Sequence, residues 1–224
     1  MKKFLRFVEI QTKVASLIPF IIGTLFAVYT GATINLINMG LMFVSLLCID
    51  MATTGLNHYK DYKKAVLKEG YHYEVHNPMG QGAVTATGAK VILICLLSIG
   101  SIGGLILFLR TDYIVLILGG MSFGIGVTYS AGPIPASRTV LGELFSGSFM
   151  GGLIPFISYY IHIYADKPVV LSLAHGIFAI TVDIIMFLPV LWLSLPLIFL
   201  IANIMLANNI CDVKEDFINK RYTL

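Results

Sequence analysis

Long apolar runs separated by short polar segments dominate the chain. Each run is close to the roughly 20 residues that a helix needs to cross a bilayer, and each is too long for an ordinary strand. The pattern predicts an all-α, multi-pass transmembrane helical bundle with about six crossings, and we assign residues 1–224 to a single membrane-embedded domain. The runs cover approximately residues 14–30, 39–56, 91–109, 113–130, 141–163 and 188–207.

The composition agrees with a membrane protein. Hydrophobic residues make up 57% of the chain and charged residues only 12%, where a soluble domain carries about a quarter. The three cysteines, Cys48, Cys95 and Cys211, are scattered, and no spacing among them is typical of a thiol metal site or a redox pair. We therefore expect membrane lipid around the protein and no nucleic-acid partner.

Two polar clusters close apolar runs. The first extends from Asn57 to Lys64 and contains Asp61, and the second extends from Asn208 to Asp216 and contains Asp212. Charged groups are costly in or beside hydrocarbon, so these clusters are functional-site candidates. If a helix continues through Asp212 and Asp216, four residues apart, both carboxylates lie on one face and can share a divalent cation.

Connections rich in lysine and arginine alternate with connections that have few, and this pattern predicts the orientation of the protein in the membrane. Lysine and arginine are frequent at the N-terminus, in the 57–90 connection, at Arg138 and in the 208–224 tail, and scarce in the other connections. The positive-inside rule places the basic connections in the cytoplasm. We predict a multi-pass protein of the cell membrane whose active-site loops, with both carboxylate clusters, face the cytoplasm.

The stretch 169–187 is apolar enough to span the membrane. A further crossing there would return the last cluster to the outer side, together with Lys214, Lys220 and Arg221. We therefore interpret 169–187 as an outer-interface or partly re-entrant segment. Asp183, inside this stretch, is interpreted as a snorkelling or paired structural residue.

The charges on the cytoplasmic side suit magnesium and a diphosphate. Mg²⁺ is usually held by one or two carboxylates together with phosphate oxygens, and Asp61, Asp212 and Asp216 are the candidate catalytic and metal-binding residues. Arg138 and Lys63 can neutralise phosphate, arginine by bidentate bonds. A diphosphate neutralised in this way is a good leaving group, and loss of an allylic diphosphate generates a stabilised carbocation.

At these clusters the chain resembles the UbiA superfamily of membrane prenyltransferases, which carry one aspartate-rich motif after the second helix and another after the sixth. The first motif is usually Asn-Asp-x-x-Asp-x-x-x-Asp, and this chain keeps Asn57 and Asp61 but has His58 and Ala65 at the other Asp positions. The second motif, Asp-x-x-x-Asp, is intact.

Further stretches are similar to the 1,4-dihydroxy-2-naphthoate polyprenyltransferases of menaquinone synthesis. The resemblance implies substrate-binding roles for Asn57, Asn208 and Asn209, and roles near the diphosphate for Tyr129 and Arg138. The similar stretches are Glu9 to Lys13 leading into Pro19, Tyr129 to Pro135, Arg138 to Glu143, and Ala207 to Ile210.

The resemblance implies Mg²⁺-dependent transfer of a polyprenyl group from polyprenyl diphosphate to an aromatic acceptor, with 1,4-dihydroxy-2-naphthoate favoured. It also implies nine helices, so we expect a truncated version of the fold that lacks its C-terminal helices, and the activity of residues 1–224 alone stays open. Another aromatic acceptor, or a non-enzymatic transporter or structural protein, is the alternative. A transporter more often places ionisable groups near mid-membrane.

We predict that positions Lys68 and Lys220, changed to cysteine one at a time, are labelled from the same side of sealed vesicles, because the basic connections share the cytoplasm. The measurement is labelling by a membrane-impermeant thiol reagent in vesicles of both orientations. Labelling of the two positions from different sides would contradict both the topology and a shared active site.

Overall fold

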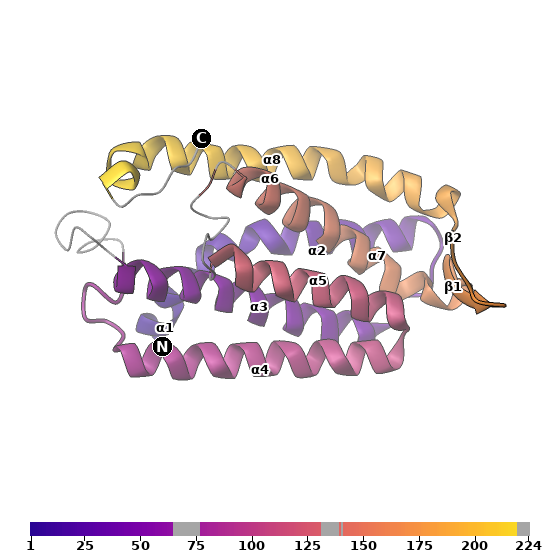
Figure 1. The fold of residues 1–224 in the computed structure, drawn as a ribbon, viewed down its shortest axis with the longest axis horizontal. Helices are drawn as coiled ribbons and strands as arrows, with labels where there is room; N and C mark the ends of the chain where they lie inside the picture. Colours follow the sequence, from indigo (N-terminus) through magenta and orange to yellow (C-terminus); the bar gives the residue numbers. More distant parts are fainter. Residues whose placement is uncertain (65–76, 131–138, 140, 219–224) are drawn as a thin grey trace.

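The structure is a computed structural model that describes residues 1–64, 77–130, 139 and 141–218. Long helices lie side by side along the long axis of the molecule (Figure 1). Short 3₁₀ helices (η1 and η5) and a π-helical segment (η4) join or interrupt them. In chain order the elements are α1 (Lys2–Phe7), η1 (Ile10–Lys13), α2 (Val14–Tyr29), α3 (Leu36–Lys64), α4 (Ala86–Arg110), α5 (Tyr113–Ser130), α6 (Gly142–Ser146), η4 (Gly147–Leu153), α7 (Ile154–Ile163), η5 (Tyr164–Asp166), β1 (Val169–Ala174), β2 (Ile177–Val182) and α8 (Ile184–Ile218).

The predicted helical crossings are confirmed. Within the described residues, five helical stretches are long and apolar enough to cross a membrane, and a shorter apolar helix covers Tyr113–Tyr129. These six stretches coincide with the six apolar runs of the sequence. At 35 residues, α8 is about 52 Å long, which exceeds the hydrocarbon thickness of about 30 Å, so one of its ends extends beyond the lipid core.

The stretch 169–187 does not form a spanning helix. Strands β1 and β2 pair antiparallel, with Val169 opposite Val182, and turn at His175 and Gly176. Both turn residues have positive φ, 52° and 79°, as a two-residue hairpin turn requires. The re-entrant or interfacial interpretation did not foresee this hairpin, which projects from one end of the bundle (Figure 1).

Asp183 connects the hairpin to α8. Its Oδ1 accepts hydrogen bonds from the backbone N–H groups of Ile185, at 3.0 Å, and Met186, at 3.2 Å. These N–H groups belong to the first turn of α8, where the helix itself provides no carbonyl acceptor for them. Asp183 is therefore the N-cap of the last helix, consistent with the structural role expected for it.

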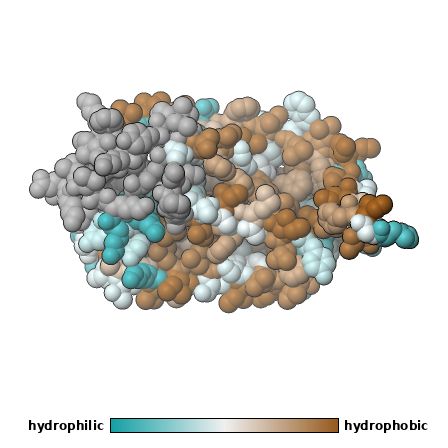
Figure 2. Space-filling view, in the orientation of Figure 1, coloured by the Kyte–Doolittle hydropathy of each residue, from teal (hydrophilic) through white to brown (hydrophobic). Residues whose placement is uncertain are grey.

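The two polar clusters lie at one end of the bundle. The C-terminal ends of α3 and α8, together with α1, form this end, which we name the loop end, and the hairpin lies at the opposite end, the hairpin end (Figure 1). In Figure 2 hydrophobic residues cover the middle of the visible face, and hydrophilic residues gather at the loop end and at the tip of the hairpin. The predicted common end is confirmed, and the side of the membrane it faces stays a prediction.

Apolar packing forms a separate cluster near each end. Near the hairpin end, α2, α3, α5, α7 and α8 meet around Phe20, Tyr160 and Val190. Near the loop end, Phe7 and Val8 are fully buried, which anchors the short basic N-terminal helix against α3 and α4. A cavity runs along the bundle from the hairpin-end cluster, whose Met42 and Ile157 line it, to Asp61 at the loop end.

Helix α8 packs closely on η4 because glycines face it. A side-chain carbon at Gly151 would lie 2.6 Å from the Ile198 Cα, and one at Gly147 would lie 2.7 Å from the Ile198 carbonyl oxygen. Real Cβ atoms do not approach backbone atoms so closely. The backbones of η4 and α8 can therefore lie this close together only because Gly147 and Gly151 have no side chains. This contact sets the distance of α8 from the rest of the bundle.

We predict that Gly151→Ala lowers the free energy of unfolding by about 1–3 kcal/mol, because its methyl group forces η4 away from the α8 backbone. Gly40→Ala is the matched control, since Gly40 is an exposed helical glycine with open space beside it. Thermal unfolding in detergent measures both variants. Equal melting temperatures for the two would contradict the packing assigned to Gly151.

Candidate active site

A cavity of about 960 Å³ lies inside the bundle. Helix α3 lines it from Met42 to Asp61, about 28 Å along the helix axis at 1.5 Å per residue. The α3 residues that line it recur every three or four positions, so they form one face of the helix. They are Met42, Ser45, Leu46, Ile49, Asp50, Thr53, Thr54, Asn57, His58 and Asp61.

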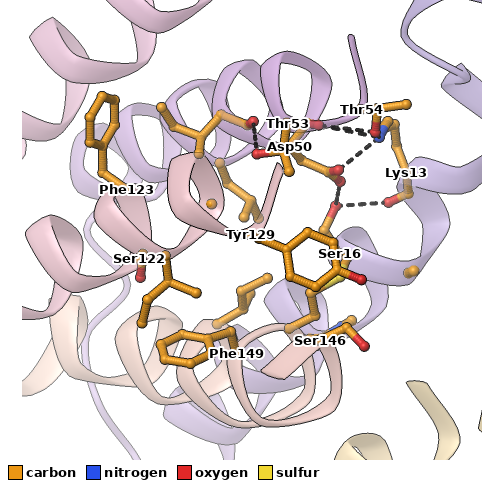
Figure 3. Close-up of a pocket in the computed structure, with 18 of the residues that line it drawn as sticks. Lys13, Ser16, Asp50, Thr53, Thr54, Ser122, Phe123, Tyr129, Ser146 and Phe149 are labelled. Carbon is orange, nitrogen blue, oxygen red and sulfur yellow. Dashed lines mark hydrogen bonds and ion pairs between the residues drawn. The ribbon is translucent and has the colours of Figure 1, made fainter. Parts of the chain in front are cut away.

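The character of this lining changes along the cavity. Its deeper walls are largely apolar, with Phe123 from α5 and Phe149 from η4 (Figure 3). Its loop end is polar, because Asn57 and Asp61 from α3 lie there with Asn208 and Asn209 from α8. Residues about 150 positions apart in sequence thus line one cavity, as expected for the two motifs.

His58 stands where the resemblance expects an aspartate, and it contacts a carboxylate from another segment. Its Nε2 lies 3.2 Å from Glu9 Oε1, and its carbonyl oxygen accepts a hydrogen bond from Asn77 Nδ2 at 3.0 Å. Glu9 adopts a left-handed backbone conformation, with φ of 47°, at the turn between α1 and η1. Glu9, His58 and Asp61 all line the loop end of the cavity.

The second motif lies on the last helix. Helix α8 continues to Ile218, so it includes both Asp212 and Asp216, one helical turn apart, as the shared-cation hypothesis requires. The side chains of these two residues are outside the described part of the structure. Asn208 and Asn209, one turn before Asp212, line the cavity.

Asn209 is held by a carboxylate that the sequence analysis did not single out. Its Nδ2 donates a hydrogen bond of 2.5 Å to Glu143 Oε1 of α6, and both side chains are buried. A buried carboxylate needs such donors, because an unpartnered one is costly away from water. This bond ties the start of the second polar cluster to α6.

The other predicted site residues are placed differently. The ring of Tyr129, from α5, lies among the cavity-lining side chains (Figure 3). Lys63 lies on the last turn of α3 and is exposed, outside the cavity lining. Arg138 lies outside the described residues. The structure therefore brings Asn57, Asp61 and Tyr129 to one cavity.

A buried ion pair deeper in the cavity was missed by sequence reasoning. Lys13 Nζ donates to Asp50 Oδ1 and to Thr54 Oγ1, both at 2.7 Å, and Ser16 Oγ donates to Asp50 Oδ2 at 2.6 Å (Figure 3). The available signal was Asp50 itself, an acidic residue inside an apolar run. Ionisable groups are thus present within the helices as well as at their ends.

The donors at the loop end fit magnesium bound together with a phosphate. Amide and carboxylate oxygens of Asn57 and Asp61 are the hard ligands that Mg²⁺ prefers. Among the described side chains no three His, Cys, Asp or Glu residues gather around a common metal position.

Comparison with known proteins identifies the family and the fold. The sequence model of the UbiA prenyltransferase family matches residues 16–224. A 1,4-dihydroxy-2-naphthoate octaprenyltransferase of Bacillus subtilis (strain 168) is 29% identical over 220 residues, which are 96% of this chain and 62% of that protein. A UbiA homolog from Archaeoglobus fulgidus, solved bound to GPP and Mg²⁺, has the same fold, with a TM-score of 0.64 and 16% identity over 99% of this chain and 67% of that one.

We predict that Glu143→Ala and Asn209→Ala each lower the free energy of unfolding by about 1–3 kcal/mol, because each leaves the other side chain buried without this partner. The double variant should cost less than the sum of the single changes. Unfolding in detergent measures the coupling, and Asn203→Ala, an exposed amide on α8, is the control. Strictly additive losses would contradict the assigned bond.

Proposed function

The chain belongs to the UbiA prenyltransferase family, and we propose that it transfers a polyprenyl group from polyprenyl diphosphate to an aromatic acceptor, in a reaction that depends on Mg²⁺. The chain spans 62% of the length of the curated relative. The activity, the substrates and the metal dependence are therefore proposals.

One observation carries the proposal. A single cavity has a polar loop end, lined by Asn57, Asp61 and Asn208, and deep walls that are largely apolar. A prenyl diphosphate has the same division, with a charged head and a hydrocarbon tail. A ligand that entered with its head at the loop end would leave its tail among apolar side chains and its reactive carbon between the two regions.

The roles of the residues follow from charge. Asp61, Asp212 and Asp216 would hold Mg²⁺, which when bound neutralises the diphosphate and makes it a better leaving group. Lys63 and Arg138 are the candidates for additional phosphate contacts. The apolar walls would exclude water from the allylic carbocation, which would otherwise be hydrolysed. No covalent enzyme intermediate is needed.

We infer 1,4-dihydroxy-2-naphthoate as the acceptor. The motif resemblance and the name of the Bacillus relative support this inference. An electron-rich hydroxynaphthoate ring is also a suitable nucleophile for an allylic cation, and its two fused rings match an apolar cavity. Another hydroxylated aromatic acceptor is the alternative, and product analysis by mass spectrometry with several acceptors separates the two.

We predict that Asp61→Ala, Asp212→Ala and Asp216→Ala each lower prenyl transfer on the order of a hundredfold or more, because each would remove a carboxylate proposed to bind the metal. The measurement is product formation in proteoliposomes that contain the full-length protein, with membrane insertion checked in parallel. Asp166→Ala, an exposed carboxylate at the hairpin end, should retain activity. Near-normal turnover by an Asp212 and Asp216 double variant would refute the mechanism.

A further inference from the structure

Both residues of the ion pair between Lys13 and Asp50 line the cavity, but their side chains differ in exposure. The side chain of Lys13 is 3% exposed and that of Asp50 is 15% exposed. The three protons of the ammonium group are all directed at acceptors, namely Asp50 Oδ1, Thr54 Oγ1 and, at 3.4 Å, the Asp50 carbonyl oxygen. Lys13 is thus saturated, and the group that can meet a ligand is the carboxylate.

The carboxylate of Asp50 retains capacity to accept. An ionised carboxylate has about four lone-pair sites on its two oxygens. Lys13 occupies one site on Oδ1, and Ser16 occupies one on Oδ2. Because an ionised carboxylate accepts but does not donate, Asp50 would select a hydroxyl or N–H group and reject a phosphate or a second carboxylate. Its lysine partner balances its charge and leaves part of the carboxylate exposed.

Asp50 also lies at a suitable depth. It is eleven residues before Asp61 on the cavity face of α3, about 16 Å farther from the loop end. A diphosphate bound at Asp61 would place its allylic carbon inward from that end, toward Thr54 and Asp50. A bicyclic acceptor lying between this carbon and Asp50 would direct at the carboxylate the hydroxyl group ortho to its attacking ring carbon.

We propose that Asp50 binds a ring hydroxyl group of the aromatic acceptor and acts as the general base for it, an inference that rests on the proposed function. As a ring carbon conjugated with that hydroxyl attacks the allylic carbon, a C–C bond forms and the C–O bond to diphosphate breaks with its electron pair. The hydroxyl proton passes to Asp50, and the ring becomes a ketone. Loss of carbon dioxide or a proton from the alkylated carbon restores aromaticity, and the ring oxygen regains the proton from Asp50.

A purely structural pair would have a different signature. Lys13 and Asp50 join η1 to α3, so breaking the pair lowers stability whether or not Asp50 contacts substrate. A structural role affects all acceptors alike. A contact to one hydroxyl group affects only acceptors that carry that hydroxyl, so the acceptor itself must be varied together with the protein.

The test compares 1,4-dihydroxy-2-naphthoate with its two monomethyl ethers, in wild type and Asp50→Asn, using the full-length protein in proteoliposomes. Methoxy and hydroxyl groups donate electrons to the ring similarly, so methylation mainly removes the proton. We expect wild type to lose about a hundredfold in kcat/KM with one ether and little with the other. With the parent acceptor, Asp50→Asn should have a kcat/KM about a hundredfold below that of wild type. With the sensitive ether, the kcat/KM of Asp50→Asn should equal that of wild type.

Binding of a non-hydrolysable prenyl thiodiphosphate with Mg²⁺ is measured separately and should differ less than twofold between wild type and Asp50→Asn. Tyr160→Phe is the control. It removes a 2.6 Å hydrogen bond to Asp112 at the hairpin end, and should lower the melting temperature without changing the KM for the acceptor. If Asp50→Asn does not fold, equal use of the parent acceptor and both ethers by wild type still overturns the inference.

Two results would overturn the inference while leaving the proposed function intact. Wild type could use both ethers as well as the parent acceptor, or Asp50→Asn could lose the same factor with all three. A wild-type protein that neither binds the donor analogue nor forms any prenylated product would instead refute the proposed function, and this inference with it.

Discussion

A charged group inside a lipid-embedded bundle is costly unless it has a partner within the protein, and two carboxylates of this protein have such partners. Lys13 pairs with Asp50, and Glu143 pairs with Asn209, in each case from another segment of the chain. Such partners are required because a buried charge without one is costly. The pairs therefore fix the packing of η1 on α3 and of α6 on α8, and they determine where the cavity is polar.

Close packing and open space are distributed unequally along the bundle. The glycines of η4 allow α8 to approach closely, and apolar side chains fill both ends. The space between them is bounded along one side by a continuous face of α3, which begins among apolar residues and ends at Asp61. A long, largely apolar cavity with a polar loop end agrees with the proposed substrate, which has a diphosphate head and a hydrocarbon tail.

The sequence predicted the spans and the two motifs because both are local properties. A run of about 20 apolar residues can satisfy its backbone only as a helix in lipid, whatever surrounds it. The hairpin at 169–182 was not predicted, because a short apolar run has no strong preference between helix and strand. Its signal was two six-residue segments around His175 and Gly176, a turn that requires positive φ at both positions.

The sequence by itself determined that this is a membrane helical bundle with acidic motifs closing two of its spans, since hydrophobicity and charge along one chain suffice for that. Only the tertiary structure decided which polar groups meet. Lys13 reaches a carboxylate 37 residues away and Asn209 one 66 residues away. These distances in sequence carry no information about contact, because a partner is selected by the packing of helices against one another, and that packing depends on side chains along their whole length.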